Sequence, residues 1–505
     1  DYMNTKWKEE MPAFIEKTDA FYAGELPMKD YKGFSGFYGS YGQKGGKASM
    51  LRLRMPCGEV DKDKLKFVTE TFTKHGVKRC HFTTCQTIQL HDLSKEQLYP
   101  IMDEALDNGI IFMGGGGDFP RNVMCSPLSG VEEDEYFDVM PYAKKASEYL
   151  LTLVKAEKMP RKLKVCFSSS KKNLPHATFR DLGFAANEKG LFDVYCCGGL
   201  GNNPRFGVKV AEDVNPEDVL YYVKAMRDMF LKYGNYENRA RARTRYMVEA
   251  LGGEDNLRNT FNEFLKEALK SDLKISAEKT ELSKTGDKEI SGLFITPQKQ
   301  KGLYAYMYHP KGGVPDINVM INLYDTIKDM DDVKLRLCPD ESCYIINLTA
   351  EELEKVKAVL SDNATNLFET SVSCIGSATC QVGLRDSQSL LTKCINAVKE
   401  ANINSLPQIH ISGCPSSCGT HQIGKLGFRG HTKVVDKVPQ VAFMFYAGGD
   451  DRQGNETMGK EVGVILENDI PVFLTELGKA VEESGLSFDE WYTIEKVEEI
   501  AKKYL

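Results

Sequence analysis

The sequence predicts a fold of the α+β class that is built around an internal duplication. Two stretches, 77–106 and 332–360, share one plan: a β-rich stretch, a short turn, a second β-rich stretch and an amphipathic helix. In the second copy, Thr349 is placed to cap the helix, and apolar residues such as Leu353 and Val356 recur at helical spacing. Strands followed by a helix within each copy favour two ferredoxin-like units that lie side by side. A chain of 505 residues is also too long for one core, so we expect about three or four units.

Composition and pattern divide the chain into five segments. The first is rich in aromatic residues and glycine, which favours irregular structure in an arm that wraps the core. Charged residues at 277–289 indicate a linker, and helical patterns occur at 256–273, 472–484 and 488–504. The predicted segments are an N-terminal arm (1–44), a first ferredoxin-like repeat (45–124), an α/β lobe (125–282), a second ferredoxin-like repeat (290–361) and a second α/β lobe (362–505).

Composition limits the classes of function. The 14 cysteines are scattered through a long chain of ordinary composition, which is typical of a reducing compartment and not of a disulfide scaffold. No apolar run approaches the roughly 20 residues that cross a membrane, and the N-terminal residues show no secretory pattern. A net charge of −7 gives no support to nucleic-acid binding. We therefore expect a cytoplasmic protein with no membrane or nucleic-acid partner.

Four cysteines near the C-terminus are the strongest chemical signal. Cys374 and Cys380 form one pair, and Cys414 and Cys418 form the other, in the sequence GCPSSCG. Thiolates at such positions can hold a [4Fe-4S] cluster, in which each iron takes one cysteine. Gly413 and its neighbours favour a tight turn whose N–H groups can point at sulfur. A structural zinc site is the alternative, but zinc sites usually have shorter spacings within each pair.

Around these cysteines the chain resembles the sirohaem-containing sulfite and nitrite reductases. CIGSATC (374–380) and ISGCPSSCGTHQIGKLGFRG (411–430) are similar to the signature that holds the cluster in that family. Further blocks match the family in the family's order, and together they cover most of residues 45–450. They are MLRLRMPCGEV (50–60), HFTTCQTIQLHDL (81–93), GDFPRNVMCSPLSG (117–130), MPRKLKV (159–165) and CCGGLGNNP (196–204).

This resemblance implies the cofactors and the architecture. The expected cofactors are sirohaem and a [4Fe-4S] cluster, with Cys374, Cys380, Cys414 and Cys418 as the cluster ligands and the Cys418 thiolate shared with the sirohaem iron. The expected architecture has three lobes and a pseudo-two-fold axis, with the two repeats over the cofactor and the two α/β lobes binding it. No flavin or nicotinamide domain is evident, so the resemblance implies a separate electron donor such as a ferredoxin.

Basic residues in the matching blocks form the expected substrate site. Sulfite and nitrite are small oxyanions, and a cationic pocket attracts them and neutralises charge as electrons arrive. By resemblance this pocket draws on Arg52, Arg121, Lys162 and Lys164. Each lies in a strand-like context whose alternation points it into a cavity, although Arg54 could replace Arg52 if the register shifts by two residues.

Other residues in the blocks are expected to bind the macrocycle. Gly198, Gly199 and Gly201 could bring backbone N–H groups close to the sirohaem carboxylates, although the same residues could simply form a tight turn. Three polar residues match family positions near the macrocycle. They are Thr83, Gln86 and Asn122.

Cys85 departs from the family pattern. The family usually has an arginine between the threonine and the glutamine of this block, and the chain has a small, soft thiol instead. Either another base compensates or the site holds its cofactor or substrate differently. Cys80 lies nearby in the sequence, and a redox role for the two cysteines is an alternative to simple burial.

The sequence therefore predicts a reductase that transfers six electrons to sulfite, to nitrite or to both. Lys164 favours sulfite, because many nitrite reductases have asparagine at the matching position, and the missing arginine at Cys85 favours nitrite. We expect a slight preference for sulfite. The alternatives are a dedicated ferredoxin-nitrite reductase, a non-catalytic electron-transfer subunit and a zinc-stabilised interaction protein.

Overall fold

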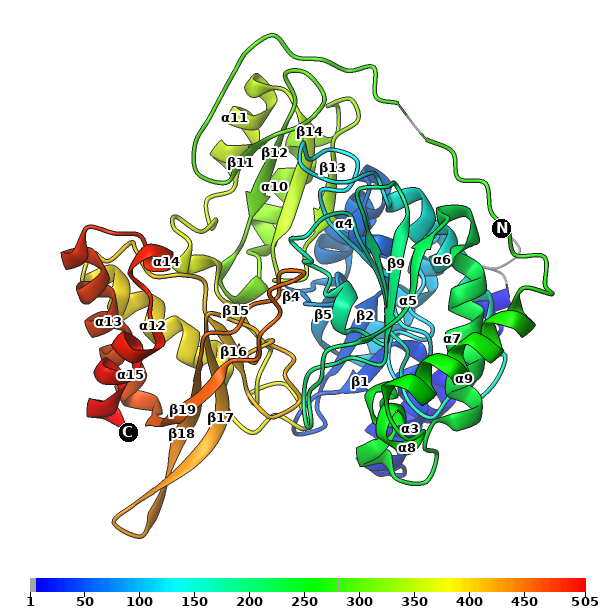
Figure 1. The fold of residues 1–505 in the computed structure, drawn as a ribbon, viewed down its shortest axis with the longest axis horizontal. Helices are drawn as coiled ribbons and strands as arrows, with labels where there is room; N and C mark the ends of the chain where they lie inside the picture. Colours follow the sequence, from blue (N-terminus) through cyan, green and yellow to red (C-terminus); the bar gives the residue numbers. More distant parts are fainter. Residues whose placement is uncertain (1–5, 280) are drawn as a thin grey trace.

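Four β-sheets make up the framework of the described residues, 6–279 and 281–505. The structure is a computed structural model. Two sheets belong to the ferredoxin-like repeats, and two belong to the α/β lobes. Figure 1 shows the second repeat at the top and the C-terminal α/β lobe on the left, while the first repeat and the first α/β lobe overlap on the right of this view. No described helix is long and apolar enough to cross a membrane.

The sheet of the first repeat has the strand order β1-β2-β5-β4. Its helices pack on one face, and α5 begins at a capping box in which Ser94 and Gln97 exchange hydrogen bonds. The elements are β1 (Ser40–Gly42), β2 (Ser49–Leu53), α4 (Lys62–His75), β4 (Arg79–Phe82), β5 (Ile88–Leu93) and α5 (Lys95–Asp107).

The sheet of the second repeat has the order β11-β12-β14-β13-β3. Its edge strand β3 comes from the first repeat and pairs antiparallel with β13, with Val60 opposite Leu335. The elements are β3 (Glu59–Val60), β11 (Ile295–Pro297), β12 (Tyr304–Tyr308), α10 (Ile317–Ile327), β13 (Lys334–Leu337), β14 (Cys343–Leu348) and α11 (Ala350–Val359).

The two repeats correspond residue by residue, which confirms the predicted duplication. Thr349 caps α11 through the same capping box that Ser94 makes at α5. Gln86 and Glu341 occupy equivalent positions, because each precedes the capping residue of its repeat by the same number of residues. Both have a left-handed φ, of 58° and 70°. One hydrophobic core contains buried residues of both repeats, such as Leu90 and Ile345, so the repeats form one body.

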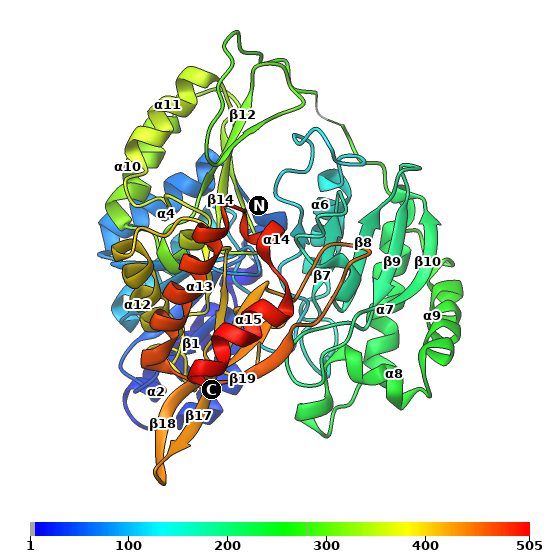
Figure 2. The same ribbon diagram turned by 60° about the vertical axis from the view of Figure 1, so that its left-hand side comes forward.

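The two α/β lobes also share one topology. In the first lobe β6, β7 and β8 are parallel, and β9 and β10 continue the sheet antiparallel; β15 to β19 repeat this pattern in the second lobe. Figure 2 shows helices of each lobe against its sheet. The first lobe contains β6 (Met124–Cys125), α6 (Met140–Thr152), β7 (Val165–Ser168), β8 (Leu182–Ala186), β9 (Phe192–Cys196), β10 (Val208–Val214), α7 (Val219–Tyr233), α8 (Met247–Ala250) and α9 (Glu254–Ala268). The second contains β15 (Val372–Ser373), α12 (Ser387–Glu400), β16 (His410–Ser412), β17 (Leu426–Val435), β18 (Val438–Ala447), β19 (Lys460–Leu466), α13 (Ile470–Ser484), α14 (Phe488–Trp491) and α15 (Ile494–Ala501).

The prediction of irregular structure before residue 45 was wrong. The segment contains α2 (Met11–Tyr22) and α3 (Met28–Ser35), and β1 adds an edge strand to the first sheet. These helices form because their aromatic side chains have a core to enter: Phe14 and Tyr31 are fully buried. Between α9 and β11 the described residues form no helix or strand, as the predicted linker requires, and Figure 1 shows them running over the outside of the protein.

Candidate active site

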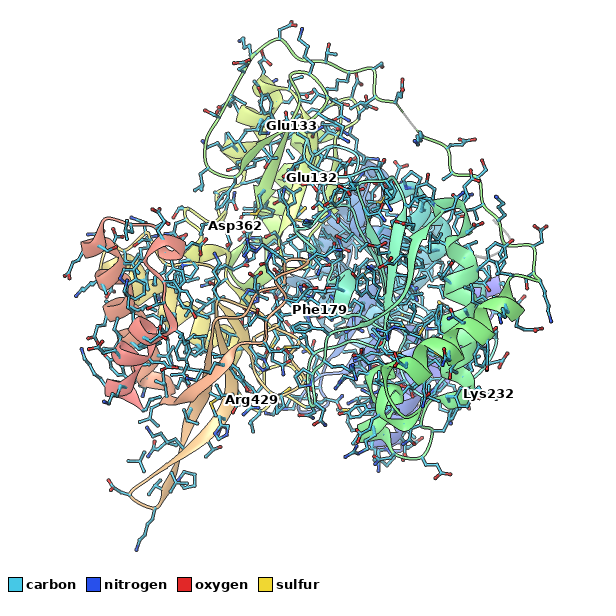
Figure 3. All side chains as sticks on the ribbon, in the orientation of Figure 1. Glu132, Glu133, Phe179, Lys232, Asp362 and Arg429 are labelled. Atoms are coloured by element: carbon cyan, nitrogen blue, oxygen red, sulfur yellow. The ribbon has the colours of Figure 1, made fainter. Side chains whose placement is uncertain are left out.

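A cavity of about 1680 Å³ lies where the first repeat meets both α/β lobes. This exceeds the roughly 300–1,000 Å³ of ordinary small-molecule pockets, so it has room for a large cofactor and a small anion. Phe179, part of its lining, lies near the centre of the molecule in Figure 3, whereas Lys232 lies at the outer side of α7. All but one of the predicted site residues line this cavity. They are Arg52, Thr83, Arg121, Asn122, Lys162, Lys164, Gly198, Gly199, Gly201, Cys374, Cys380, Cys414 and Cys418.

The four cysteines lie on two loops of the second α/β lobe. Cys374 and Cys380 follow β15, and Cys414 and Cys418 follow β16. All four cysteines line the same cavity. Burial, followed by the charge of Cys418, raises the pKa of Cys374 to about 12. Among the described residues, no three His, Cys, Asp or Glu side chains are close enough to hold a single metal ion. A cubane cluster needs no such closeness, because each iron takes one thiolate.

The backbone around the cysteines is arranged to contact sulfur. The N–H of Gly413 donates to Cys374 Sγ at 3.1 Å, a contact of the kind that tunes the potential of a cluster. A side chain at Gly413 would bring its Cβ within 2.5 Å of the Arg385 carbonyl oxygen, so only glycine fits. Between the second two cysteines, Ser417 has a left-handed φ of 59°, which tightens the turn. These loops fit an iron–sulfur cluster.

The first repeat fixes the position of both cysteine loops. Thr84 Oγ1 donates to the carbonyl oxygen of Cys418 at 3.0 Å. The N–H of Lys44 and the guanidinium of Arg79 both donate to Thr379, each at 3.0 Å. The cysteines are therefore held against the repeat that also lines the cavity.

Lys162, Lys164 and Arg121 form the cationic wall. Burial, and then neighbouring positive charges, lower the pKa of both lysines; for Lys164 the thiol of Cys85 opposes this. Burial and the charge of Arg52 lower the pKa of Arg121 to about 10. Because bringing these cations together costs free energy, the wall is suited to binding an anion.

Arg52 and Arg54 have different roles. Arg54 lines the cavity but is buried and donates to the carbonyl oxygens of Met113, Pro120 and Arg121 at 3.0–3.1 Å, so its guanidinium is already engaged with the backbone that carries Arg121. Arg52 also donates to a backbone carbonyl, that of Gly115, but is only half-buried. Arg52 is therefore the more available of the two arginines, and its role at the anion stays a prediction.

Several cavity arginines were not found from the sequence. Arg161, Arg180, Arg243 and Arg245 all line the cavity, and the Nε atoms of Arg161 and Arg243 are buried without a hydrogen-bond partner. Buried guanidinium nitrogens without a partner are what a cofactor with many carboxylates would satisfy. For Arg243 and Arg245 the signal in the sequence was the basic run NRARARTRY at 238–246. The donor set therefore fits sirohaem.

Gln86 is the predicted site residue that lies elsewhere. Its side chain is fully buried and donates to the carbonyl oxygens of Cys125 and Leu337, at 2.8 and 2.6 Å. It holds sheets together, and its predicted place beside the macrocycle was wrong. Asn122, by contrast, does line the cavity, and its Oδ1 is buried and unpartnered. Thr83 also lines the cavity, and its hydroxyl lies 2.7 Å from that of Thr87.

The glycine turn also differs from the prediction. The N–H of Gly198 donates to the Arg180 carbonyl oxygen at 3.0 Å, and the N–H of Gly199 donates to that of Arg205 at 3.0 Å. The N–H of Gly201 donates to the Gln422 side chain at 2.8 Å. Because all three donors are engaged, the turn contributes space and not the N–H groups for carboxylates.

Cys85 takes the place of the family's arginine with a direct contact to a lysine. Its Sγ lies 3.2 Å from Lys164 Nζ. Burial raises the pKa of the Cys85 thiol, but Lys164, Arg180 and Arg52 outweigh this effect and hold it at about 6. Cys80, the other half of the suggested pair, is fully buried and has a pKa raised by burial, so it is an inert core thiol.

A buried histidine and a glutamate also line the cavity. His81 Nε2 lies 2.6 Å from Glu341 Oε2, and Glu341 Oε1 accepts from the N–H of Ser373 at 2.7 Å. Burial lowers the pKa of His81 to about 4 and raises that of Glu341, so the proton of this pair resides on the carboxyl group.

Four grouped thiols beside a large cationic cavity define a redox protein that holds a metal cofactor next to a small anion. Comparison with known proteins identifies the family. Residues 116–269 match the family model described as nitrite and sulphite reductase 4Fe-4S domain, and residues 41–108 match the nitrite/sulfite reductase ferredoxin-like half domain. The chain belongs to the sulfite and nitrite reductase family and is an oxidoreductase, as the sequence predicted. The four cysteines lie outside the matched residues, so their role as ligands stays a prediction.

Relatives and a solved structure agree with this family. The chain is 25% identical to the chloroplastic ferredoxin–nitrite reductase of Zea mays over 79% of its length and 73% of the relative's. It is 26% identical to the sulfite reductase [NADPH] hemoprotein beta-component of Bacillus pumilus, over 75% and 73%. The structure of Mycobacterium tuberculosis NirA matches with a TM-score of 0.78 at 21% identity, over 92% of this chain and 90% of that one. The predicted fold class and the family cofactors, sirohaem and a [4Fe-4S] cluster, are confirmed.

Proposed function

We propose that the protein reduces sulfite to sulfide and nitrite to ammonia, with a slight preference for sulfite. The observation that carries the proposal is the cationic wall, where Arg121, Lys162 and Lys164 share one cavity with the four cysteines. A protein that only transfers electrons needs no such wall, because it binds no oxyanion. A separate ferredoxin-like protein is the proposed donor, and a cytoplasmic location remains a prediction.

The residues that hold the cofactors follow from the site. Cys374, Cys380, Cys414 and Cys418 would bind the cluster irons, and Cys418 would also reach the sirohaem iron. Arg161 and Arg243, the cavity arginines whose Nε atoms are buried and unpartnered, would bind the sirohaem carboxylates. When bound, the two groups would pass electrons from the donor protein to the anion, six for each anion that is reduced.

The protein's own groups bind the anion and handle protons. Arg121 and Lys162 orient the oxyanion and stabilise the charge that builds up on its oxygen atoms. The lowered pKa of Lys162 makes its ammonium a better proton donor than an ordinary lysine, so it can protonate an oxygen that leaves as water. Glu341 holds a proton within hydrogen-bond distance of His81 Nε2 at the cavity wall, so this carboxyl group can supply protons close to the anion.

Spectra and steady-state kinetics of the purified protein test the proposal. We expect haem bands with a cluster contribution, and turnover of both anions when reduced viologen is the donor. A colourless protein would contradict the cofactor assignment. A coloured protein inactive on both anions would instead support the electron-transfer subunit.

The choice between the anions is tested at Lys164. A second ammonium favours the anion of higher charge, since two unit charges about 4 Å apart interact by about 4 kcal/mol at an effective dielectric of 20. Lys164→Asn should therefore lower kcat/KM for sulfite more than for nitrite. Wild-type protein that reduces nitrite well and sulfite not at all would refute the preference and favour a dedicated nitrite reductase, the second candidate, which the names of several relatives support.

A further inference from the structure

Cys85 is placed as an anion inside the cationic wall. Its Sγ lies 3.2 Å from Lys164 Nζ, in the range of a charge-assisted contact to sulfur. The amide of Asn122 donates to the Cys85 carbonyl oxygen at 3.2 Å, which fixes the backbone of the residue. The charged groups that act on the thiol come from three elements: Lys164 before β7, Arg180 before β8 and Arg52 on β2. All of them are cationic.

We propose that Cys85 is a specificity-determining residue, whose thiolate pairs with Lys164 and cancels one positive charge of the anion site. The proposal rests on the proposed function, because it concerns which anion that site prefers. It explains how a wall that contains Lys164 can still accept nitrite: the ammonium that favours the more highly charged anion is already partly neutralised.

The chemistry of the thiol supports this role. Burial alone would keep Cys85 protonated, yet the surrounding cations lower its pKa to about 6, so it is ionised near neutral pH. Lys162 offers a contrast: burial and then neighbouring cations, led by Lys164, lower its pKa, and Cys418 opposes them. Of these two cavity lysines, Lys164 is the one whose ammonium is in contact with the Cys85 sulfur.

Alkylation of the holoenzyme measures the ion pair without using activity. The rate at which iodoacetamide labels Cys85, followed by mass spectrometry of its peptide, should rise with pH around a midpoint near 6. Lys164→Gln should move the midpoint upward by about 1–3 pH units, the usual effect of one close opposite charge. Lys162→Gln is the matched control and should move it little. A wild-type midpoint at the ordinary cysteine value of about 8.5 would overturn the proposal.

Two variants of equal shape then test the effect on specificity. Cys85→Asn removes the negative charge, and Cys85→Asp keeps it. We expect the ratio of kcat/KM for sulfite to that for nitrite to rise about tenfold in the asparagine variant, which corresponds to about 1.4 kcal/mol, and to stay near the wild-type value in the aspartate variant. Equal ratios in both variants would overturn the specificity role.

The two experiments separate the possible failures. A low alkylation midpoint in an enzyme that reduces neither anion would overturn the proposed function, and the specificity role with it, while the ion pair would stand. A high midpoint in an active enzyme would overturn the ion pair and leave the proposed function intact.

Discussion

Replacing Gln86 by leucine tests whether this side chain holds the protein together or binds the cofactor. Its amide nitrogen donates to the carbonyl oxygens of Cys125 and Leu337, and its Oε1 accepts from the N–H of Cys125 at 2.8 Å. One side chain therefore joins the β4–β5 turn to a strand of the first lobe and to a strand of the second repeat.

The size of the effect follows from these contacts. Leucine is similar in volume and has no hydrogen-bonding group, so the substitution leaves one donor and two acceptors of the strands without their partner. Each buried group left unsatisfied costs about 1–3 kcal/mol. Because the strands can relax in part, we expect the free energy of unfolding to fall by about 3–6 kcal/mol.

Chemical denaturation followed by circular dichroism measures this loss. Gln86→Glu is a second test: it keeps an acceptor for the Cys125 N–H but sets a buried carboxylate against the two carbonyl oxygens, so its loss should be at least as large as that of leucine. The haem spectrum of folded Gln86→Leu protein should be unchanged. A loss of unfolding free energy below about 1 kcal/mol, together with altered haem bands, would refute the reasoning and indicate that Gln86 binds the cofactor.

Cys418→Ser should lose the cluster, the sirohaem coupling or both, with turnover close to zero; normal iron content and normal activity would exclude Cys418 as the bridge. Arg121→Ala and Lys162→Ala should each reduce turnover by about 10²–10³ while the haem spectrum persists; wild-type kinetics in both would place the anion elsewhere. Glu59→Gln should lower the stability of the protein at neutral pH and make that stability less dependent on acid. Burial raises the pKa of Glu59, but cations, led by Arg336 at 2.8 Å, hold it well below its usual value. Its stabilisation is therefore present above the unfolded-state pKa near 4.5 and is lost as the pH falls below it. The variant should lose about 3 kcal/mol at pH 7 and show a flatter acid limb in denaturation curves, and an unchanged acid limb would contradict this.

Much of the fold could be predicted because each repeat carries its own local signals. Ser94 and Thr349 mark helix starts by capping, and the strand patterns before them are regular. The helices before residue 45 could not be predicted in the same way. Aromatic and glycine residues in that segment suit a loop, and they become helical because tertiary burial of residues such as Phe14 outweighs local preference.

The candidate site was predictable where motifs lie close in sequence and not where separate segments meet. The match of Gln86 to a family position suggested that it lies near the macrocycle. Its left-handed φ of 58° turns the chain, so that Cys85 lines the cavity and Gln86 enters the protein interior. The contact between Cys85 and Lys164 joins residues 79 positions apart, and no pattern in either segment indicates it.

The pairing of β3 with β13 has a consequence for how the protein is made. Ribosomes add about 5–20 residues each second, so tens of seconds pass between synthesis of Glu59 and synthesis of Arg336, its partner across the two strands. During that time the strand β3 has no partner at its edge, and the first repeat exposes the apolar residues that later join the core shared with the second repeat. Neither cofactor can be fully enclosed until the last lobe leaves the ribosome, since that lobe carries all four cysteines. The site that encloses metal and macrocycle is therefore completed only when the last lobe has folded against the first repeat.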